Sequence, residues 1–360
     1  MMNNSCKVPF SEVEIHENGN VYVCCPAKMQ LAIGNIYEQS FDEIWHSNSA
    51  QKLRHEILYN NNYCFCNLNI CNPQNNIEQD KLKLIEGIKV NFTEKPDYPI
   101  YVKFCHDHHC NLKCITCRDD FYTNSPTKIQ ELDSKIEKYY LPILKNCKIV
   151  SLNGSGEVFA SKHCRNLIKA IVKKYPDIKF DLHTNGVLCD KKNCDELGIT
   201  DKIISVDVSM HSVSKKIYNK IMLGSNYEKV LSNLKWLSSL KQKGQLKRLD
   251  LYFVVQKINY KEMADFVDFA KSIDADVYFW EYRNWGNLWG AKNYEKVAIF
   301  EKFHYQYNQF AKYLENKNFN AKNCHLNNYL KQIKTITLQE HILCIIQHKL
   351  EYIKKYISKK

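Results

Sequence analysis

The chain has 360 residues, a formal net charge of +12 and sixteen cysteines. Its length suits about two domains, and its hydrophobic content of 44% allows a substantial core. The excess of basic residues favours anionic ligands such as phosphorylated sugars, nucleotides or nucleic acids. No signal segment is visible in residues 1–10, and no apolar run approaches the ~20 residues of a membrane span. We therefore expect a cytoplasmic protein whose closely spaced cysteines bind metal or react rather than form disulfides.

The first 74 residues are rich in cysteine and short in regular structure. Residues 13–16 and 21–23 alternate like strands, and the Asn18-Gly19 pair between them predicts a hairpin turn. Residues 40–58 have helical apolar spacing. Six cysteines bracket these elements: Cys6, Cys24, Cys25, Cys64, Cys66 and Cys71. A metal-stabilised module is predicted, because so small a unit has a thin core of its own.

From residue 98 onward, strand-like and helix-like stretches alternate, which predicts parallel strands joined by crossover helices. The predicted strands are 100–105, 148–153, 179–183, 203–210, 249–256 and 276–280. The predicted helices are 127–145, 161–175, 191–197, 227–240 and 260–273. Six such units make an α/β fold with a partial (βα)6 TIM-like barrel, in which chemistry is expected at the carboxyl ends of the strands.

The first predicted strand of this series runs directly into three closely spaced thiols, Cys110, Cys114 and Cys117. We call them the motif cysteines. Three thiolates can hold three irons of a four-iron cubane and leave the fourth iron open to a small molecule. A structural zinc site is the alternative, because His106, His108 and His109 stand close by in the sequence.

Polar turns follow the next three predicted strands. The first is Asn153-Gly154-Ser155-Gly156-Glu157, whose glycines allow a close approach of backbone to ligand. The second is His183-Thr184-Asn185-Gly186, and the third begins at Ser209 and includes His211. We interpret His211 as a structural residue.

The three-thiol spacing resembles the signature of the radical S-adenosylmethionine (SAM) enzymes. The resemblance implies a [4Fe–4S] cluster on the motif cysteines, with SAM bound at its open iron. It also implies a cofactor-binding role for Gly154, Ser155, Gly156, Glu157, Thr184, Asn185 and Ser209. Two positions depart from the family pattern: Met222 replaces an arginine that commonly pairs with the SAM carboxylate, and Thr116 replaces an aromatic residue beside the third cysteine. A thioether cannot substitute for a bidentate guanidinium, so Lys220 or another base must take that role, or the contact is absent.

The N-terminal module resembles the SPASM or twitch module of many radical SAM enzymes. The resemblance rests on the cysteine-ended hairpin, the Ile33-Gly34-Asn35-Ile36 turn, the helix start at Phe41 and the closing cysteine group. It implies an auxiliary iron–sulfur cluster with Cys6, Cys24, Cys66 and Cys71 as ligands and Cys25 and Cys64 as reserves. A zinc-stabilised hairpin is the alternative, which the softness of thiolates and the neighbouring redox motif disfavour. In the family this module usually follows the barrel, whereas here it precedes it.

The predicted organisation is a SPASM-like module at 1–74, a linker with one short helix at 75–97, a partial barrel at 98–290 and a helical extension at 291–360. No strand is predicted in the extension. Its last helix carries an apolar stripe and ends in lysines. Such a helix normally packs against its own domain. Contact with an anionic membrane is the less favoured alternative. We interpret Cys324 and Cys344 as packing residues.

The sequence therefore predicts an oxidoreductase-type radical enzyme that cleaves SAM to a 5′-deoxyadenosyl radical and removes a hydrogen atom from its substrate, in epimerisation or dehydrogenation. Net charge and the aromatic segment 281–290, with Arg283, favour an anionic or sugar-like substrate; a peptide is the alternative. Cys25, Cys105, Cys164 and Cys189 are candidate hydrogen-atom donors, and flavodoxin or ferredoxin is the expected electron donor. A non-catalytic zinc- or nucleic-acid-binding protein is the competing hypothesis, although no nucleic-acid recognition motif appears.

Overall fold

The computed structural model describes residues 6–60, 63–68, 71, 81–152, 156–284 and 288–357. The chain forms two compact units. The first comprises residues 1–111, 122–207 and 239–249, and the second comprises 112–121, 208–238 and 250–360. The chain changes unit after residues 111, 121, 207, 238 and 249, and each unit is described by itself.

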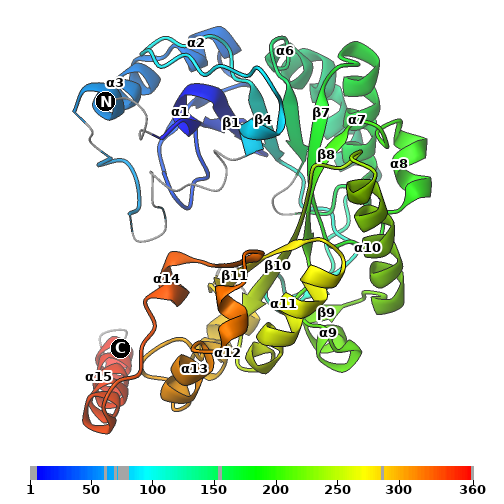
Figure 1. The fold of residues 1–360 in the computed structure, drawn as a ribbon. Coiled ribbons are helices and arrows are strands. Elements are labelled where there is room, and N and C mark those ends of the chain that lie inside the picture. Colours follow the sequence, from blue (N-terminus) through cyan, green and yellow to red (C-terminus); the bar gives the residue numbers. More distant parts are fainter. Residues whose placement is uncertain are drawn as a thin grey trace. The chain divides into compact units, whose positions relative to one another are not determined.

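The first unit is built on a sheet whose strand order is β3-β2-β1-β4-β6-β7-β8. Its strands are β1 (Glu12–His16), β2 (Asn20–Tyr22), β3 (Ala32–Asn35), β4 (Tyr101–Cys105), β6 (Ile149–Leu152), β7 (Lys179–Thr184) and β8 (Ile203–Ser209). The N-terminal hairpin belongs to this sheet, because β1 pairs in parallel with β4, from Glu12 opposite Tyr101 to His16 opposite Cys105 (Figure 1). This pairing was not predicted from the sequence.

Helices follow the central strands of this unit, as crossover connections require. After β4 come α5 (Pro126–Lys135), a π-helical turn (Ile136–Tyr140) and α6 (Leu141–Ile143), where one continuous helix was predicted. α7 (Lys162–Lys174) begins at Ser161, whose hydroxyl accepts a hydrogen bond from the Cys164 amide. α8 (Lys191–Leu197) matches its predicted bounds and ends at Gly198, whose positive φ of 68° suits glycine.

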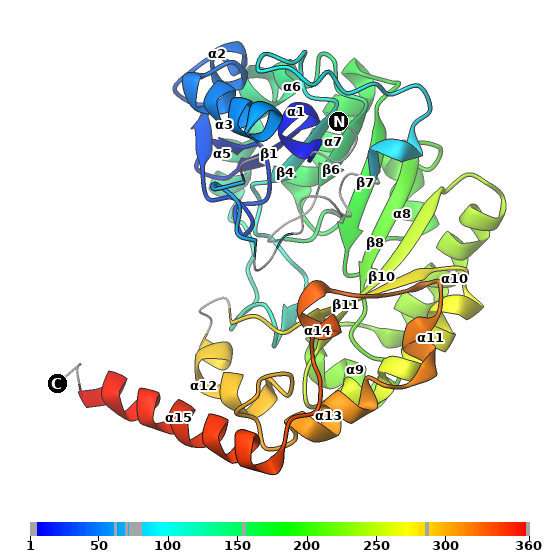
Figure 2. The same ribbon diagram turned by 60° about the vertical axis from the view of Figure 1, so that its left-hand side comes forward.

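In the N-terminal part of this unit, α1 (Val8–Ser11), α2 (Phe41–Trp45) and α3 (Asn48–Tyr59) lie around β1 (Figure 2). The helix predicted over 40–58 is therefore two helices, because Ser47 caps a new one through a hydrogen bond from the Ala50 amide. Arg54 is fully buried, with its guanidinium 4.0 Å from the Trp45 ring centroid. This packing gives the module a core beyond its cysteines.

The segment predicted as a linker contributes to the core of the first unit. Its short helix is a 3-10 turn (Leu82–Leu84), and Leu82 packs against the sheet residues Tyr101, Ile149 and Ile204. Just before it, the ammonium of Lys81 is buried 2.7 Å from Asp181 and 2.8 Å from Asp207. Part of the predicted linker therefore lies in the core, where the Lys81 ammonium stands between two buried carboxylates.

The second unit has three parallel strands, β10 (Arg248–Val255), β11 (Asp276–Glu281) and β12 (Cys324–Leu326), and a two-stranded sheet of β5 (Lys113–Cys114) and β9 (Met222–Leu223). Its helical elements are α9 (Lys215–Ile221), α10 (Tyr227–Gln242), η4 (Tyr260–Glu262), α11 (Met263–Ser272), α12 (Leu288–Val297), α13 (Tyr307–Tyr313), η5 (Lys317–Asn320), α14 (Asn328–Lys331) and α15 (Leu338–Ile357). Phe253, Phe266 and Phe279 pack α11 onto the strands.

The prediction of an α/β fold with a parallel sheet is confirmed, and the described bounds of each of the six predicted strands lie within one residue of expectation. The C-terminal extension is mainly helical, as expected. The prediction that it lacks a strand is wrong, because β12 pairs with β11, opposite residues 277–279. Among the described residues, no helix is long and apolar enough to cross a membrane.

Candidate metal and SAM site

In the first unit, the loop that leads to Cys110 is fixed by Asp107. Its Oδ1 accepts hydrogen bonds from the His109 amide and from Asn124 Nδ2, both at 2.9 Å. Its Oδ2 accepts a further hydrogen bond from the Ser161 hydroxyl at the start of α7. Asp107 is buried, and its three donors define the path of the chain immediately before the first motif cysteine.

Glu157 connects this loop to the end of β7. Its amide donates to the His109 carbonyl at 2.7 Å. Its carboxylate accepts from the Thr184 hydroxyl at 2.6 Å and from the Asn185 amide at 2.7 Å. Burial raises the pKa of Glu157, while the hydrogen bonds from Thr184 and Asn185 act in the opposite direction.

Asn185 carries the connection to the cysteine motif. Its side-chain amide donates to Asn111 Oδ1 at 2.9 Å and lies 4.0 Å from the Cys110 sulfur. The Cys110 amide donates to the Tyr122 carbonyl at 3.0 Å. The loops after β4, β6 and β7 therefore meet at Cys110, as expected for the carboxyl ends of neighbouring parallel strands.

Gly156 is required by the closeness of two backbones. A Cβ atom at this position would lie 2.4 Å from the Asp107 carbonyl oxygen and 2.7 Å from that of His109. Only glycine permits this approach. Residues 153–155, which include the predicted site residues Gly154 and Ser155, lie outside the described residues.

In the second unit, the other two motif cysteines lie on β5 and the turn after it. Cys114 is paired with Met222 of β9, and its sulfur lies 3.5 Å from the Met222 sulfur. The Cys117 amide donates to the Cys114 carbonyl at 2.9 Å, which closes a tight turn. The contact between Cys114 and Met222 was not foreseen; the sequence only marked residue 222 as a departure from the family pattern.

The sulfur atoms of the motif cysteines are accessible enough to bind a metal cluster. Cys110 and Cys114 are partly exposed and Cys117 is exposed, whereas Cys147, Cys164, Cys189 and Cys194 are buried. Accessible thiols suit iron ligation, so the donor set fits a cluster. In the described part of the chain, however, no set of three or more His, Cys, Asp or Glu side chains is assembled that could hold a metal ion.

The histidines of the zinc alternative are engaged elsewhere. His106 is buried with its Nε2 2.7 Å from that of His163, and burial lowers the pKa of His106 to about 3. His108 pairs with Glu17 at 3.1 Å, and His109 Nδ1 accepts from the Asn124 amide at 3.1 Å. These contacts give zinc no histidine ligand set beside the motif.

In the N-terminal module, Cys6, Cys66 and Cys71 interact electrostatically with one another. Burial raises the pKa of Cys6 to about 12 and that of Cys66 to about 11, and the neighbouring thiols contribute to both shifts. These thiols stay protonated at neutral pH unless a cation stabilises the thiolates, which is what a metal cluster does. Cys24 is buried after β2, Cys25 is half-buried and Cys64 is exposed.

Of the four candidate hydrogen-atom donors, Cys105 lines a cavity of about 460 Å³ together with His16, Tyr22 and His108. Cys25 interacts electrostatically with Cys105. Cys164 lies 3.7 Å from Asp107, and Cys189 is hydrogen-bonded to Cys194. Both are buried in packing environments.

The remaining residues that the sequence singled out differ in their burial and contacts. Ser209 is half-buried at the end of β8. His211 is buried, and its Nδ1 accepts a hydrogen bond from the Val254 amide at 3.2 Å. Lys220 is exposed near the end of α9. Arg283 pairs with Glu281 at 2.8 Å, and residues 285–287 of the aromatic segment lie outside the described residues.

Two family models match the chain. The SPASM model, an iron–sulfur cluster-binding domain, matches residues 6–72, and the radical SAM superfamily model matches residues 106–270. The chain therefore contains a SPASM domain and a radical SAM domain. The radical SAM domain implies a [4Fe–4S] cluster and SAM, and the SPASM domain implies an auxiliary iron–sulfur cluster. The N-terminal position of the SPASM domain is confirmed.

Curated relatives of this radical SAM protein have different activities. GTP 3′,8-cyclase of Synechocystis sp. is 26% identical over 53% of this chain and 55% of its own length. The Bacillus subtilis antilisterial bacteriocin subtilosin biosynthesis protein AlbA is 25% identical over 34% of this chain and 26% of its own. The chain thus spans about half, or less, of the length of these relatives. A solved structure of Streptococcus suis SuiB bound to precursor peptide SuiA has a TM-score of 0.41 at 17% identity, covering 79% of this chain and 63% of that one.

Proposed function

We propose that this radical SAM protein modifies a peptide, using a [4Fe–4S] cluster held by the motif cysteines. The observation that carries the site assignment is the chain of contacts from Glu157 through Asn185 to Cys110, because it joins predicted SAM residues to the first predicted cluster ligand. When bound, the cluster and SAM supply reductive SAM cleavage and hydrogen-atom abstraction.

The residues of the chain have distinct roles in this proposal. The motif thiols bind iron as thiolates. Asn185 orients the first of them through Asn111, and the Glu157 carboxylate fixes Asn185 by accepting its amide hydrogen bond. Thr184 holds the other carboxylate oxygen, and Ser209 belongs to the same proposed SAM site.

We propose Cys6, Cys24, Cys66 and Cys71 as ligands of the auxiliary cluster, with Cys25 and Cys64 as reserves. The mutual electrostatic interaction of Cys6, Cys66 and Cys71 supports this set. The proposed boundaries remain a SPASM module at 1–74, a connection at 75–97, a catalytic domain at 98–290 and an extension at 291–360.

The peptide substrate is supported by the relationship to AlbA, a bacteriocin biosynthesis protein. The relatives give the expected carbohydrate substrate no support. A nucleotide is the second candidate, because three relatives are GTP 3′,8-cyclases and the chain carries a net charge of +12.

The test is anaerobic reconstitution with iron and sulfide, followed by SAM and dithionite. A broad absorbance near ~400 nm that bleaches on reduction and release of 5′-deoxyadenosine are expected. Cys114→Ala should abolish the release, while Cys344→Ala, on α15, should leave it unchanged. Release by Cys114→Ala at the wild-type rate would overturn the site assignment.

The substrate is tested by comparing GTP with a pool of synthetic peptides in deuterated water. Peptides should accelerate 5′-deoxyadenosine formation and change in mass, with a +1 shift if the reaction is an epimerisation. Acceleration by GTP alone would overturn the peptide proposal in favour of a nucleotide substrate.

A further inference from the structure

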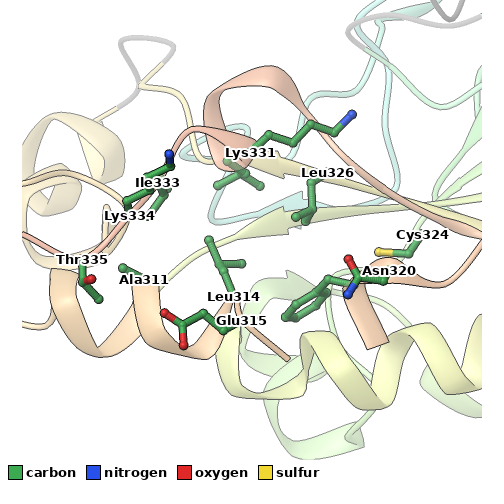
Figure 3. A pocket seen from close by; sticks show the side chains of 12 residues that line it. Ala311, Leu314, Glu315, Asn320, Cys324, Leu326, Lys331, Ile333, Lys334 and Thr335 are labelled. Carbon is green, nitrogen blue, oxygen red and sulfur yellow. The ribbon is translucent and has the colours of Figure 1, made fainter. Parts of the chain in front are cut away.

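A second cavity lies in the C-terminal extension, in a part of the chain that neither family model covers. It has a volume of about 470 Å³ and is lined by residues between Ala311 and Thr335, all in the second unit. α13, η5, β12 and α14 surround it (Figure 3). Nothing in the proposed radical chemistry uses this cavity.

Part of the cavity lining is apolar, and the rest is polar or charged. Leu314, Phe319, Leu326 and Leu330 contribute aliphatic and aromatic surface, and Leu330 is 1% exposed. Figure 3 shows Leu314 and Leu326 in the middle of the cavity lining. A hollow of this size and character accommodates one or two apolar side chains.

Two ammonium groups stand at the rim. Lys331 and Lys334 are exposed lining residues, and neither forms an ion pair with another described residue. Lys331 also interacts electrostatically with the Cys324 thiol, which brings its charge close to the cavity. Glu315 is the acidic lining residue, so the rim is net positive and favours a ligand that carries negative charge.

One wall of the cavity is a sheet edge. β12 pairs with β11 and is the last strand of the described sheet. The Val277 amide donates to the Asn323 carbonyl, and the Asn327 amide donates to the Phe279 carbonyl, so alternate residues of β12 face β11. Leu326, which stands between them, turns its backbone groups toward the outer edge and lines the cavity. Cys324 also lines the cavity, but its amide donates to the Ala321 carbonyl, so only its carbonyl is left for an added strand.

We propose that this cavity and the edge of β12 bind an extended, acidic peptide segment by β-strand addition. One apolar side chain of the segment enters the hollow between Leu314 and Leu326, and a neighbouring carboxylate pairs with Lys331 and Lys334. Backbone hydrogen bonds give such a complex its affinity, and the pocket and charges give it selectivity. The inference rests on the proposed peptide-modifying function and adds a recognition site on the extension.

The probe is a fluorescein-labelled peptide of sequence Thr-Val-Asp-Leu-Asp-Val-Thr, titrated with the full chain and followed by fluorescence anisotropy. We expect a dissociation constant of about 100 µM or below. Replacing both acidic residues of the probe by lysine should weaken binding about tenfold or more, and so should proline at the two valine positions, which blocks strand addition.

Two variants of the chain test the cavity itself. Lys331→Glu with Lys334→Glu, and separately Leu314→Trp, should each weaken binding of the acidic probe about tenfold. Lys349→Glu with Lys354→Glu, on α15, makes the same change in net charge and should leave binding unchanged. Equal binding by wild type and both cavity variants, or no anisotropy change up to about 1 mM protein, would overturn the proposal.

The outcome is separable from that of the proposed function. Binding is measured without SAM, and Cys114→Ala should bind the probe like wild type. A chain that releases 5′-deoxyadenosine but fails to bind the probe contradicts only the docking site, whereas probe binding with Cys114-independent release contradicts only the catalytic assignment. If sedimentation shows a dimer that the lysine variant dissociates and the probe does not, the edge is an interface between copies and the proposal is wrong.

Discussion

The Met222 thioether lies directly against the second motif cysteine, with 3.5 Å between the Met222 and Cys114 sulfur atoms. The contact is built into the pairing of β5 with β9, in which these two residues are opposite each other. Met222 is 1% exposed. Where the family resemblance implies a charged contact to SAM, this chain therefore has an apolar side chain that packs beside a proposed cluster ligand.

Met222→Ala should remove that packing and destabilise the chain by about 2–5 kcal/mol, the usual cost of truncating a buried methionine. Met222→Leu conserves volume and should cost less than about 1.5 kcal/mol. Denaturant unfolding measures both values, and iron analysis after gel filtration measures cluster retention. Equal iron loss in the two variants would show that the sulfur, and not the packing, is what matters.

Glu157→Gln should uncouple the loops after β6 and β7 from Cys110. The carboxylate now accepts hydrogen bonds from both the Thr184 hydroxyl and the Asn185 amide. In glutamine, one of the two oxygens becomes an NH2 group, which cannot accept, so one of these hydrogen bonds would be lost. A lost hydrogen bond to a charged group costs about 1.5–3 kcal/mol, so 5′-deoxyadenosine formation should fall about 10- to 100-fold. Thr184→Val removes one donor and keeps the carboxylate, so its effect should be smaller; the reverse order would argue against the assigned role of Glu157.

Gly156→Ala should displace the backbone of residues 107–109, because the new methyl group would lie 2.4 Å from one carbonyl oxygen and 2.7 Å from another. Neither atom belongs to a flexible side chain, so relief requires backbone movement. We expect destabilisation of about 1–3 kcal/mol and weaker retention of iron at the motif cysteines. Thermal unfolding and iron content measure these effects. Wild-type values for both would mean that the loop at residues 107–109 can move without cost.

Lys81→Met should leave Asp181 and Asp207 buried without their cation and destabilise the chain by about 3–5 kcal/mol at neutral pH. Lys89→Met, at an exposed position of the same segment, should change stability by less than about 0.5 kcal/mol.

The pH dependence of this effect follows from Asp207. Burial alone would raise the pKa of Asp207, but Lys81 and His183 together hold it well below its usual range. Its contribution is therefore complete above the unfolded pKa of about 3.9 and is lost as the pH falls toward the folded value. The difference in unfolding free energy between wild type and Lys81→Met should shrink below about pH 4. A difference that stays constant from pH 7 to pH 3 would contradict the ion-pair explanation.

Cys66→Ala should remove the auxiliary cluster and leave the first one intact. If both clusters contain four irons, iron content should fall from about eight to about four per chain, while a band near ~400 nm that dithionite bleaches should persist. Cys194→Ala, at a buried thiol outside the SPASM module, serves as the control and should keep full iron content. If Cys66→Ala retains all of its iron, Cys66 is not a ligand, and Cys64 would be assigned in its place.

Much of this arrangement could be predicted from residue patterns. Alternating apolar runs gave the strands, and the polar turns after them marked Glu157, Thr184 and Asn185, which prove to share hydrogen bonds. These signals are local, because strand periodicity and turn chemistry are properties of neighbouring residues.

What the sequence did not reveal depends on contacts between distant segments. The parallel pairing of β1 with β4, the burial of Lys81 against Asp181 and the Met222–Cys114 contact each join residues more than 80 positions apart. β12 escaped prediction because a three-residue strand has too few alternations to show a period. The interruption of the helix over 40–58 had a local signal in Ser47, a favourable capping residue.

The parallel pairing of β1 with β4 has a practical consequence for anyone dissecting this protein. A shortened version that begins at residue 98 would lack β1, the strand that pairs with β4. The backbone amide and carbonyl groups along that edge of β4, a hydrophobic strand, would then be unpaired. Such exposed edges recruit other chains. The catalytic half is therefore expected to precipitate when produced alone, and co-expression with residues 1–97 as a separate polypeptide should rescue it.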